Sequence, residues 1–307
     1  MKTVFVLIAV AICFTAYAAT DPRGGAWTAE VDGDNVQMTL FRRDHGGTCG
    51  FQVPLAVLSG LTKADATGTA ANVKFEMRRS AGTIVFDGRF SDSEGAGHYH
   101  FTPSDAFVRE MDSLGYSGFT DEQLLVFATT DFSPQMIRDL RAMGYQPTQK
   151  EVEEIAIFHV TAEVLREYAR LGYPNLTLRA AVNLRVGRVD ADYINGMKQL
   201  GYSGFTALRI ADLAIIGVRP SYVRELQAAG LTNLTARELE NLRVGGITAK
   251  KIEEYKKLGY TNLTAHELSE MGIMGVTPDY IRRVQAAGYN GVPPDKMIKL
   301  RMSGLVK

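Results

Sequence analysis

A repeating unit of about 29 residues organises this chain from Ser104 to its C-terminus. Each copy contains a Gly-Tyr pair, once Gly-Leu, and successive glycines are spaced by 29, 28, 29, 29, 29 and 29 residues. A fixed period of this size is typical of stacked supersecondary units, which bury their apolar faces only against one another. The repeated glycines are Gly115, Gly144, Gly172, Gly201, Gly230, Gly259 and Gly288.

The sequence pattern of each repeat predicts two short helices. In the first helix, apolar residues such as Ile281 and Val284 recur at helical spacing, and the closing glycine suits a left-handed cap. The second helix starts at a threonine with a glutamate three residues later, as in Thr235 and Glu238, which is the pattern of a capping box. Helices of this length are marginal alone. We therefore expect an α-solenoid of about seven helix pairs over residues 104–307.

The tripeptide Asn-Leu-Thr occurs three times and matches a glycosylation sequon. Its threonine coincides each time with the predicted start of a second helix. This fixed register favours a structural role in the turn and cap over glycosylation. The asparagines are Asn175, Asn233 and Asn262.

Residues 1–18 have the pattern of a secretory signal peptide. Lys2 supplies the positive end, an apolar core covers residues 4–14, and Ala16-Tyr17-Ala18 fits a cleavage site. We expect a mature chain that begins near Ala19, starts with a polar linker over residues 19–26, and is exported to the periplasm or the medium. After cleavage a single cysteine, Cys49, remains, so no intramolecular disulfide is expected. No later segment is apolar enough for a membrane span.

Residues 27–103 change from helical periodicity to alternation. Val36, Met38 and Leu40 alternate with Gln37, Thr39 and Phe41, and Phe75 and Met77 belong to a similar run. This pattern predicts strands with one buried face, in a small antiparallel β-sandwich or partial barrel of about five to seven strands. Residues 54–61 are expected to form a short helix and residues 91–97 a turn-rich link. The whole chain is thus predicted to be an α+β multidomain protein.

Charge and motifs exclude several function classes. The chain has 34 basic and 34 acidic residues, so its net charge gives no pull toward nucleic acid. Walker loops, nucleophile elbows and paired CxxC motifs are absent, and the sequence after His266-Glu267 departs from the HExxH pattern. We therefore predict no catalytic residues and no cofactor.

Four residues of the β region are candidates for a metal site. His98 and His100 are two apart on a predicted strand and so share a face, while His45 and Cys49 lie in one loop-like segment. Histidine and cysteine are the ligands that zinc prefers. The alternative, which we favour, is a pair of surface histidines and a buried thiol without metal.

An arginine recurs at one position of the first helix in five of the seven copies, often followed by an acidic residue. Stacking would align these arginines in a row able to bind carboxylates of a partner. The alternative is a ladder of ion pairs between repeats on a solvated face, and the sequence favours it. The arginines are Arg109, Arg138, Arg166, Arg224 and Arg282.

The chain resembles uncharacterised extracytoplasmic regions that accompany some membrane zinc peptidases of the β-lactam-sensor type, and similar exported proteins. The resemblance rests on residues 51–55 (FQVPL), on the run from Gly88 to Pro103, and on the helical unit at residues 275–282 (GVTPDYIR). It implies an uncharacterised β domain plus helical repeats with a sensing or interaction role at the cell envelope. The peptidase motif is absent here, so no catalytic residue is implied.

The sequence thus supports an exported, non-catalytic scaffold that binds a protein or peptide partner. Two other classes of function stay open, namely a ligand-binding or enzymatic β domain carried on a structural helical array, and a purely structural protein of the envelope. A pocket lined by the histidines of the β region would favour the enzyme, and a groove along the repeats would favour the scaffold.

Overall fold

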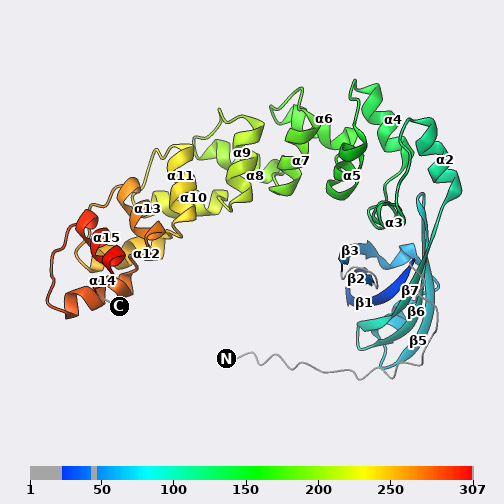
Figure 1. Cartoon of the computed structure of the whole chain (residues 1–307), viewed down its shortest axis with the longest axis horizontal. Helices are drawn as coiled ribbons and strands as arrows, with labels where there is room; N and C mark the ends of the chain where they lie inside the picture. Colours follow the sequence, from blue (N-terminus) through cyan, green and yellow to red (C-terminus); the bar gives the residue numbers. More distant parts are fainter. Residues whose placement is uncertain (1–22, 43–46, 306–307) are drawn as a thin grey trace. The chain divides into compact units, whose positions relative to one another are not determined.

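The computed structural model describes residues 23–42 and 47–305. The chain divides into two compact units. The first contains the residues up to Arg109 and Gly118–Thr129, and the second contains Glu110–Ser117 and the chain from Thr130 onward. The first unit holds an antiparallel sheet and the second a helical array (Figure 1). The predicted α+β fold class is therefore confirmed. The predicted signal peptide and His45 lie outside the described residues.

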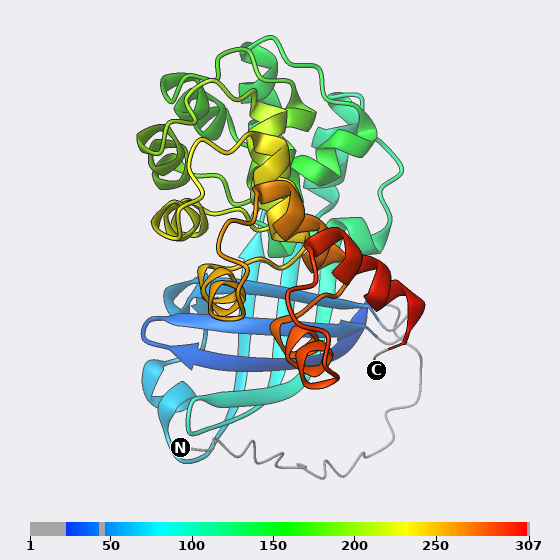
Figure 2. The same ribbon diagram turned by 90° about the vertical axis from the view of Figure 1, so that its left-hand side faces the viewer.

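A strongly curled antiparallel sheet forms the first unit (Figures 1 and 2). Its order is β3-β2-β1-β7-β6-β5-β4, and the terminal strands of this order are not hydrogen-bonded to each other, so the sheet is a partial barrel. The described strands are β1 (Gly24–Asp32), β2 (Asn35–Arg42), β3 (Thr48–Pro54), β4 (Leu58–Ser59), β5 (Ala71–Arg79), β6 (Gly82–Ser91) and β7 (Glu94–Pro103). β1 thus begins inside the segment predicted as linker.

The predicted alternation places the core of this unit on one face of the sheet. Val36, Met38 and Leu40 are fully buried. Trp27 packs edge-on against Phe75, with ring centroids 5.5 Å apart. Its indole N–H donates to the carbonyl of His98 at 3.0 Å, which satisfies the polar atom of a buried ring.

Two local predictions in this region were wrong. Residues 54–61 form only a 3₁₀ turn, η1 (Leu55–Val57), followed by the short strand β4. Residues 91–97 are mostly strand, because β6 and β7 pair directly down to Ser91 and Glu94. The two residues between them, Asp92 and Ser93, both have positive φ, which is the geometry of a tight two-residue hairpin.

Two helices pack on the sheet, α1 (Lys63–Thr67) and α3 (Asp121–Thr129). α3 has the sequence of a repeat helix, yet it belongs to the first unit. Its Phe127 is fully buried, with its ring centroid 5.8 Å from that of Phe107. The repeat pattern therefore starts inside the first unit.

The repeats contain two helices each, as predicted. The first helices, here called A helices, are α2 (Asp105–Ser113), α4 (Pro134–Ala142), α6 (Ala162–Arg170), α8 (Ala191–Gln199), α10 (Pro220–Ala228), α12 (Ala249–Lys257) and α14 (Pro278–Ala286). The second helices, here called B helices, are α3, α5 (Gln149–Phe158), α7 (Leu178–Val186), α9 (Ala207–Ile215), α11 (Ala236–Val244), α13 (Ala265–Ile273) and α15 (Pro294–Ser303). From α5 to α15, each B helix contacts the next (Figure 1).

Helix ends in the array are fixed by local sequence, as predicted. Thr235 accepts a hydrogen bond from the amide of Glu238, and the Glu238 carboxylate accepts one from Thr235 N–H at 2.7 Å. The closing glycines are left-handed, with φ of +96° at Gly201. The amide after that glycine, in Tyr202, donates back to the carbonyl of Met197 at 3.0 Å, which completes a Schellman ending.

Tyrosine hydroxyls join an A helix to the loop that follows the B helix of the same repeat. The hydroxyl of Tyr193 donates to the carbonyl of Val218 at 2.7 Å, and that of Tyr222 to the carbonyl of Ile247 at 2.8 Å. Burial raises the pKa of both tyrosines to about 12, so the donor proton is retained at neutral pH. Tyr280 occupies the same position in α14, but its buried hydroxyl has no hydrogen-bond partner among the described residues.

A second set of contacts links successive A helices. A side chain near the end of one A helix donates to a free carbonyl at the end of the preceding one. Lys198 donates to the carbonyl of Leu171 at 2.8 Å and Lys256 to that of Ala229 at 3.0 Å. These contacts satisfy carbonyls that a helix end leaves without partners. Within the described residues, no helix has the length and apolarity that a membrane crossing requires.

Candidate partner-binding surface

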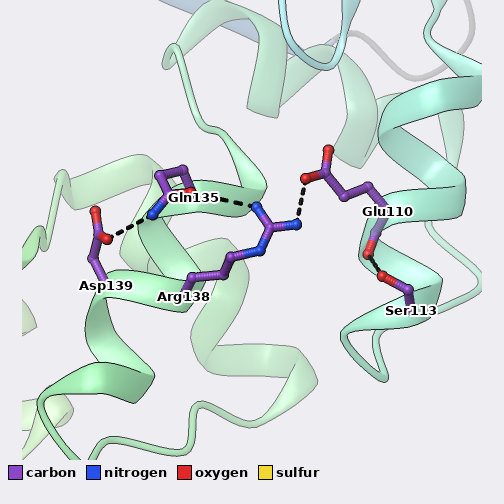
Figure 3. Close-up of polar contacts among 5 residues, drawn as sticks. All are labelled: Glu110, Ser113, Gln135, Arg138 and Asp139. Carbon is purple, nitrogen blue, oxygen red and sulfur yellow. Dashed lines mark hydrogen bonds and ion pairs between the residues drawn. The ribbon is translucent and has the colours of Figure 1, made fainter.

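The predicted arginine row lies on the exposed side of the A helices, where it forms few ion pairs. Arg138 pairs with Glu110 of the preceding A helix and contacts Gln135 of its own helix (Figure 3). Arg282 pairs with Asp279 one turn earlier. The other members, Arg109, Arg166 and Arg224, are exposed and form no ion pair with a described residue. The expected ladder is therefore formed at one step in the described chain.

The candidate metal ligands are divided between the two faces of the sheet. Cys49 is paired with Leu40 and contacts the Thr129 hydroxyl at 3.5 Å, on the buried face. His98 and His100 are exposed on the opposite face, on either side of the buried Tyr99. The strand register thus separates the cysteine from the histidines. In the described part of the chain, no cluster of three or more potential ligands is close enough to hold a metal ion.

A row of exposed aliphatic side chains runs along the ends of successive B helices. Single exposed apolar residues are ordinary on protein surfaces. Here, however, each B helix from α5 to α15 contributes one at the same position. Their exposed fractions range from 42% for Ile157 and Val186 to 70% for Met302. We call this set the rim row: Ile157, Val186, Ile215, Val244, Ile273 and Met302.

Arginines occupy alternate junctions between the B helices. Arg185 of α7 donates through Nε to the carbonyl of Phe158, at the end of α5, at 2.9 Å. Arg243 of α11 lies against Gly217 at the end of α9, with Nη2 3.0 Å from where a Cβ would stand. Arg301 of α15 lies near Gly275 at the end of α13 in the same way. We call α5/α7, α9/α11 and α13/α15 the arginine junctions.

Glycines close the intervening junctions. A Cβ on Gly187 of the α7 end would lie 3.0 Å from the Cβ of Ala214 in α9. A Cβ on Gly272 of α13 would lie 2.3 Å from the carbonyl oxygen of Gly245 at the end of α11. Contacts this close leave no room for a side chain. The two kinds of junction therefore alternate, with a glycine junction between successive arginine junctions.

The junction arginines are oriented by tyrosines of the A helices. The Arg243 guanidinium lies 5.2 Å from the ring centroid of Tyr222, and that of Arg301 lies 5.0 Å from that of Tyr280. Arg185 neighbours Tyr168, whose pKa is raised to about 12, mainly by burial. Stacking on a ring holds a guanidinium in place while it keeps N–H donors for another partner.

The first arginine junction contains a cavity of about 260 Å³. It is bordered by Phe158 and His159 at the end of α5 and by Arg185, Arg188 and Asp190 around the end of α7. The Asp190 carboxylate is already used, because it accepts the amide of Tyr193 at 2.8 Å as a helix cap. Both arginines are exposed and form no ion pair with a described residue. Because two arginines and one carboxylate border it, the cavity has a net positive charge beside apolar surface.

His159 gives this cavity a titratable group. It has a left-handed backbone with φ of +49°. Partial burial of the ring lowers the pKa of His159 below its usual value, Arg185 lowers it further, and Asp131 opposes the shift. The imidazole is therefore biased toward its neutral form beside two permanent cations.

A second hollow, of about 400 Å³, lies between α10, α12 and the start of α13. Its cation, Lys256, is engaged, with one bond to the carbonyl of Ala229 and another to Glu253 at 2.8 Å. It therefore offers less free charge than the arginine junctions.

The members of the rim row are 29 residues apart and so follow the period of the repeat, but the two kinds of junction do not, because that period treats all copies as equal. The signal was present in the sequence as an alternation between consecutive B helices. Residues 185–187 and 243–245 read Arg-Val-Gly, whereas 214–216 and 272–274 read Ala-Ile-Ile and Gly-Ile-Met. Comparison with protein-family models and with curated proteins gives no match. The function therefore has to be argued from the geometry of the array.

Proposed function

We propose that this protein is an exported, non-catalytic interaction scaffold, which binds a protein or peptide partner at the cell envelope. The rim row and the three arginine junctions are its binding surface. The observation that carries the proposal is the recurrence of one exposed aliphatic residue per B helix from α5 to α15. Export rests on the signal-peptide pattern of residues 1–18, and a sensing role rests on the sequence resemblance described above.

The composition of the rim suits partner binding better than solvent exposure. Transfer of apolar side chains out of water favours association, and arginine is enriched in protein interfaces. A repeat array can distribute such contacts over a long surface, so that each one is weak but all act together. The rim thus supplies both apolar contact and hydrogen-bond donors at regular intervals.

Partner retention by matched variants tests the proposal. Full-length protein, Val244→Asp and Arg224→Asp are immobilised and exposed to an envelope extract of the cells that make the protein. Val244 is 64% exposed on the rim, whereas Arg224 is exposed on α10, so neither change disturbs the core. We expect one set of proteins to be retained by wild type and Arg224→Asp and lost by Val244→Asp. Equal retention by both variants would overturn the rim as the binding surface.

A further inference from the structure

We infer that the rim binds an extended peptide in the polyproline II conformation, with an apolar residue at every third position and a carboxylate in every second interval between them. The inference rests on the proposed function and specifies its partner. Three features of the rim support it: the spacing of the rim row, the width of the rim row and the positions of the junction arginines.

The spacing of the rim row matches a threefold peptide period. Packed helices lie about 8–10 Å apart, and each B helix from α5 to α15 contacts the next. A polyproline II chain returns a side chain to the same side every third residue, after about 9 Å. A β-strand does so after about 6.6 Å, every second residue. One apolar residue per helix therefore fits the polyproline II period and not that of a strand.

The width of the rim argues against a helical partner. An α-helix advances about 10 Å in seven residues, so its length would also match. However, a helix is about 10 Å wide and binds through a broad apolar stripe. The rim row is narrow over its central part, because the positions one turn earlier are polar, and only at α13 does a second exposed apolar side chain, Met274, lie directly beside it in the described sequence. The polar positions are Asn183, Asp212, Asn241 and Glu270.

The charges specify where the peptide carries its carboxylates. Arg185, Arg243 and Arg301 lie between neighbouring members of the rim row at the arginine junctions, and none forms an ion pair with a described residue. Arginine donors suit a carboxylate, and also the free carbonyls of a polyproline II backbone. At the α7/α9 glycine junction, Arg219 is half-buried and donates to the carbonyls of Gly187 at 2.9 Å and Arg188 at 3.5 Å, so it offers less free charge than the exposed junction arginines. Peptide carboxylates are thus expected in alternate intervals, about six residues apart.

Synthetic peptides of about eighteen residues test this inference by fluorescence anisotropy with the full-length protein. The in-register peptide repeats the unit Leu-Pro-Glu-Leu-Pro-Pro. A second peptide has the same composition with leucine at irregular intervals, and a third is a helix with leucine at every seventh residue. We expect the in-register peptide to bind at least about tenfold more tightly than either control. Equal binding of the in-register and irregular peptides, or tighter binding of the helix, would overturn the inference.

Charge exchange tests the junctions themselves. Arg243→Glu should weaken the in-register peptide by about tenfold, and a peptide with lysine in place of its central glutamate only should regain affinity for this variant. Since Arg243 also stacks on Tyr222, Val244→Asp provides a second rim variant that disturbs no packing, and Arg224→Glu is the control. Loss of affinity in Val244→Asp but not in Arg224→Glu supports the inference, and an unchanged affinity in both rim variants contradicts it.

The extract experiment and the peptide experiment together distinguish a failure of the proposed function from a failure of the proposed peptide class. If Val244→Asp loses its partners from the envelope extract while no peptide binds in any register, the scaffold function stands and the peptide class is wrong. If retention from the extract is also unchanged in Val244→Asp, both proposals fail.

Discussion

A residue with a left-handed backbone ends each B helix, and at two helices its side chain also borders the candidate site. In the later repeats it is glycine, as at Gly217, Gly246 and Gly275, whereas α5 and α7 end on His159 and Arg188 with φ near +50°. A residue with a Cβ is strained in this conformation by about 1–2 kcal/mol. The strained residues are those that border the cavity at the first arginine junction, where their side chains contribute to the candidate site.

Replacement of His159 by glycine should therefore stabilise the array. We expect His159→Gly to raise the free energy of unfolding by about 1 kcal/mol, because it removes the strain, whereas His159→Ala keeps the Cβ and should not. Urea unfolding followed by circular dichroism measures both. A stability gain of the same size in both variants would show that the ring, and not the backbone, is responsible.

The same position predicts a pH dependence. The folded-state pKa of His159 is lowered from 6.5, so the unfolded chain takes up the proton at a higher pH than the folded chain does. The contribution of His159 to stability is therefore present above about pH 6.5 and is lost as the pH falls through its lowered pKa. His159→Gly should lose less stability than wild type between pH 8 and pH 5.

At the scale of the element, hydrogen bonds within each helix pair supply stability that the short helices lack alone. The hydroxyl of Tyr222 in α10 reaches the carbonyl of Ile247, in the loop after α11, and three further tyrosines make the equivalent bond. Sequence predicted the helices, their caps and their Schellman endings because those depend on neighbouring residues. It did not predict these bonds, because the tyrosines come from two different positions of the A helix, as in Tyr222 and Tyr255.

The tyrosine bonds supply a matched pair of variants. Tyr222→Phe leaves a buried carbonyl without a donor and should destabilise the array by about 1–2 kcal/mol. Tyr280→Phe removes a buried hydroxyl that has no partner among the described residues, so it should be neutral or slightly stabilising. Thermal or urea unfolding of the two variants provides the comparison. Equal destabilisation would show that the hydroxyl bond contributes nothing beyond packing.

At the scale of the whole molecule, the chain combines two units with separate cores. The fold class and the helical array could be predicted from the sequence, because alternation and a fixed period are visible over long stretches. The grouping of α3 with the sheet could not, because α3 has the same repeat signature as helices of the array and only its packing, as at Phe127, distinguishes it. The rim row was missed although its members are 29 residues apart, because the sequence alone does not show which apolar residues of a helix pair stay exposed after packing.

Because the two units have separate cores, we expect a destabilising substitution in the array to leave the stability of the sheet unchanged. Gly201 has φ of +96°, and a Cβ there would meet nothing within 4 Å. Gly201→Val should therefore cost about 1–2 kcal/mol through backbone strain alone. Hydrogen exchange should show lost protection around α8 and α9, with the sheet unchanged. Loss of protection in the sheet to the same extent would contradict the division into two units.

We propose that the partner binds the rim of the B helices. A photoreactive amino acid placed at single positions of the full-length protein, in the cells that make it, tests this binding surface. We expect crosslinked partner at rim positions 186, 215 and 244 and none at positions 166, 224 and 282, which carry the arginine row of the A helices. Crosslinks at the arginine row with none at the rim would show that the partner binds the A helices instead.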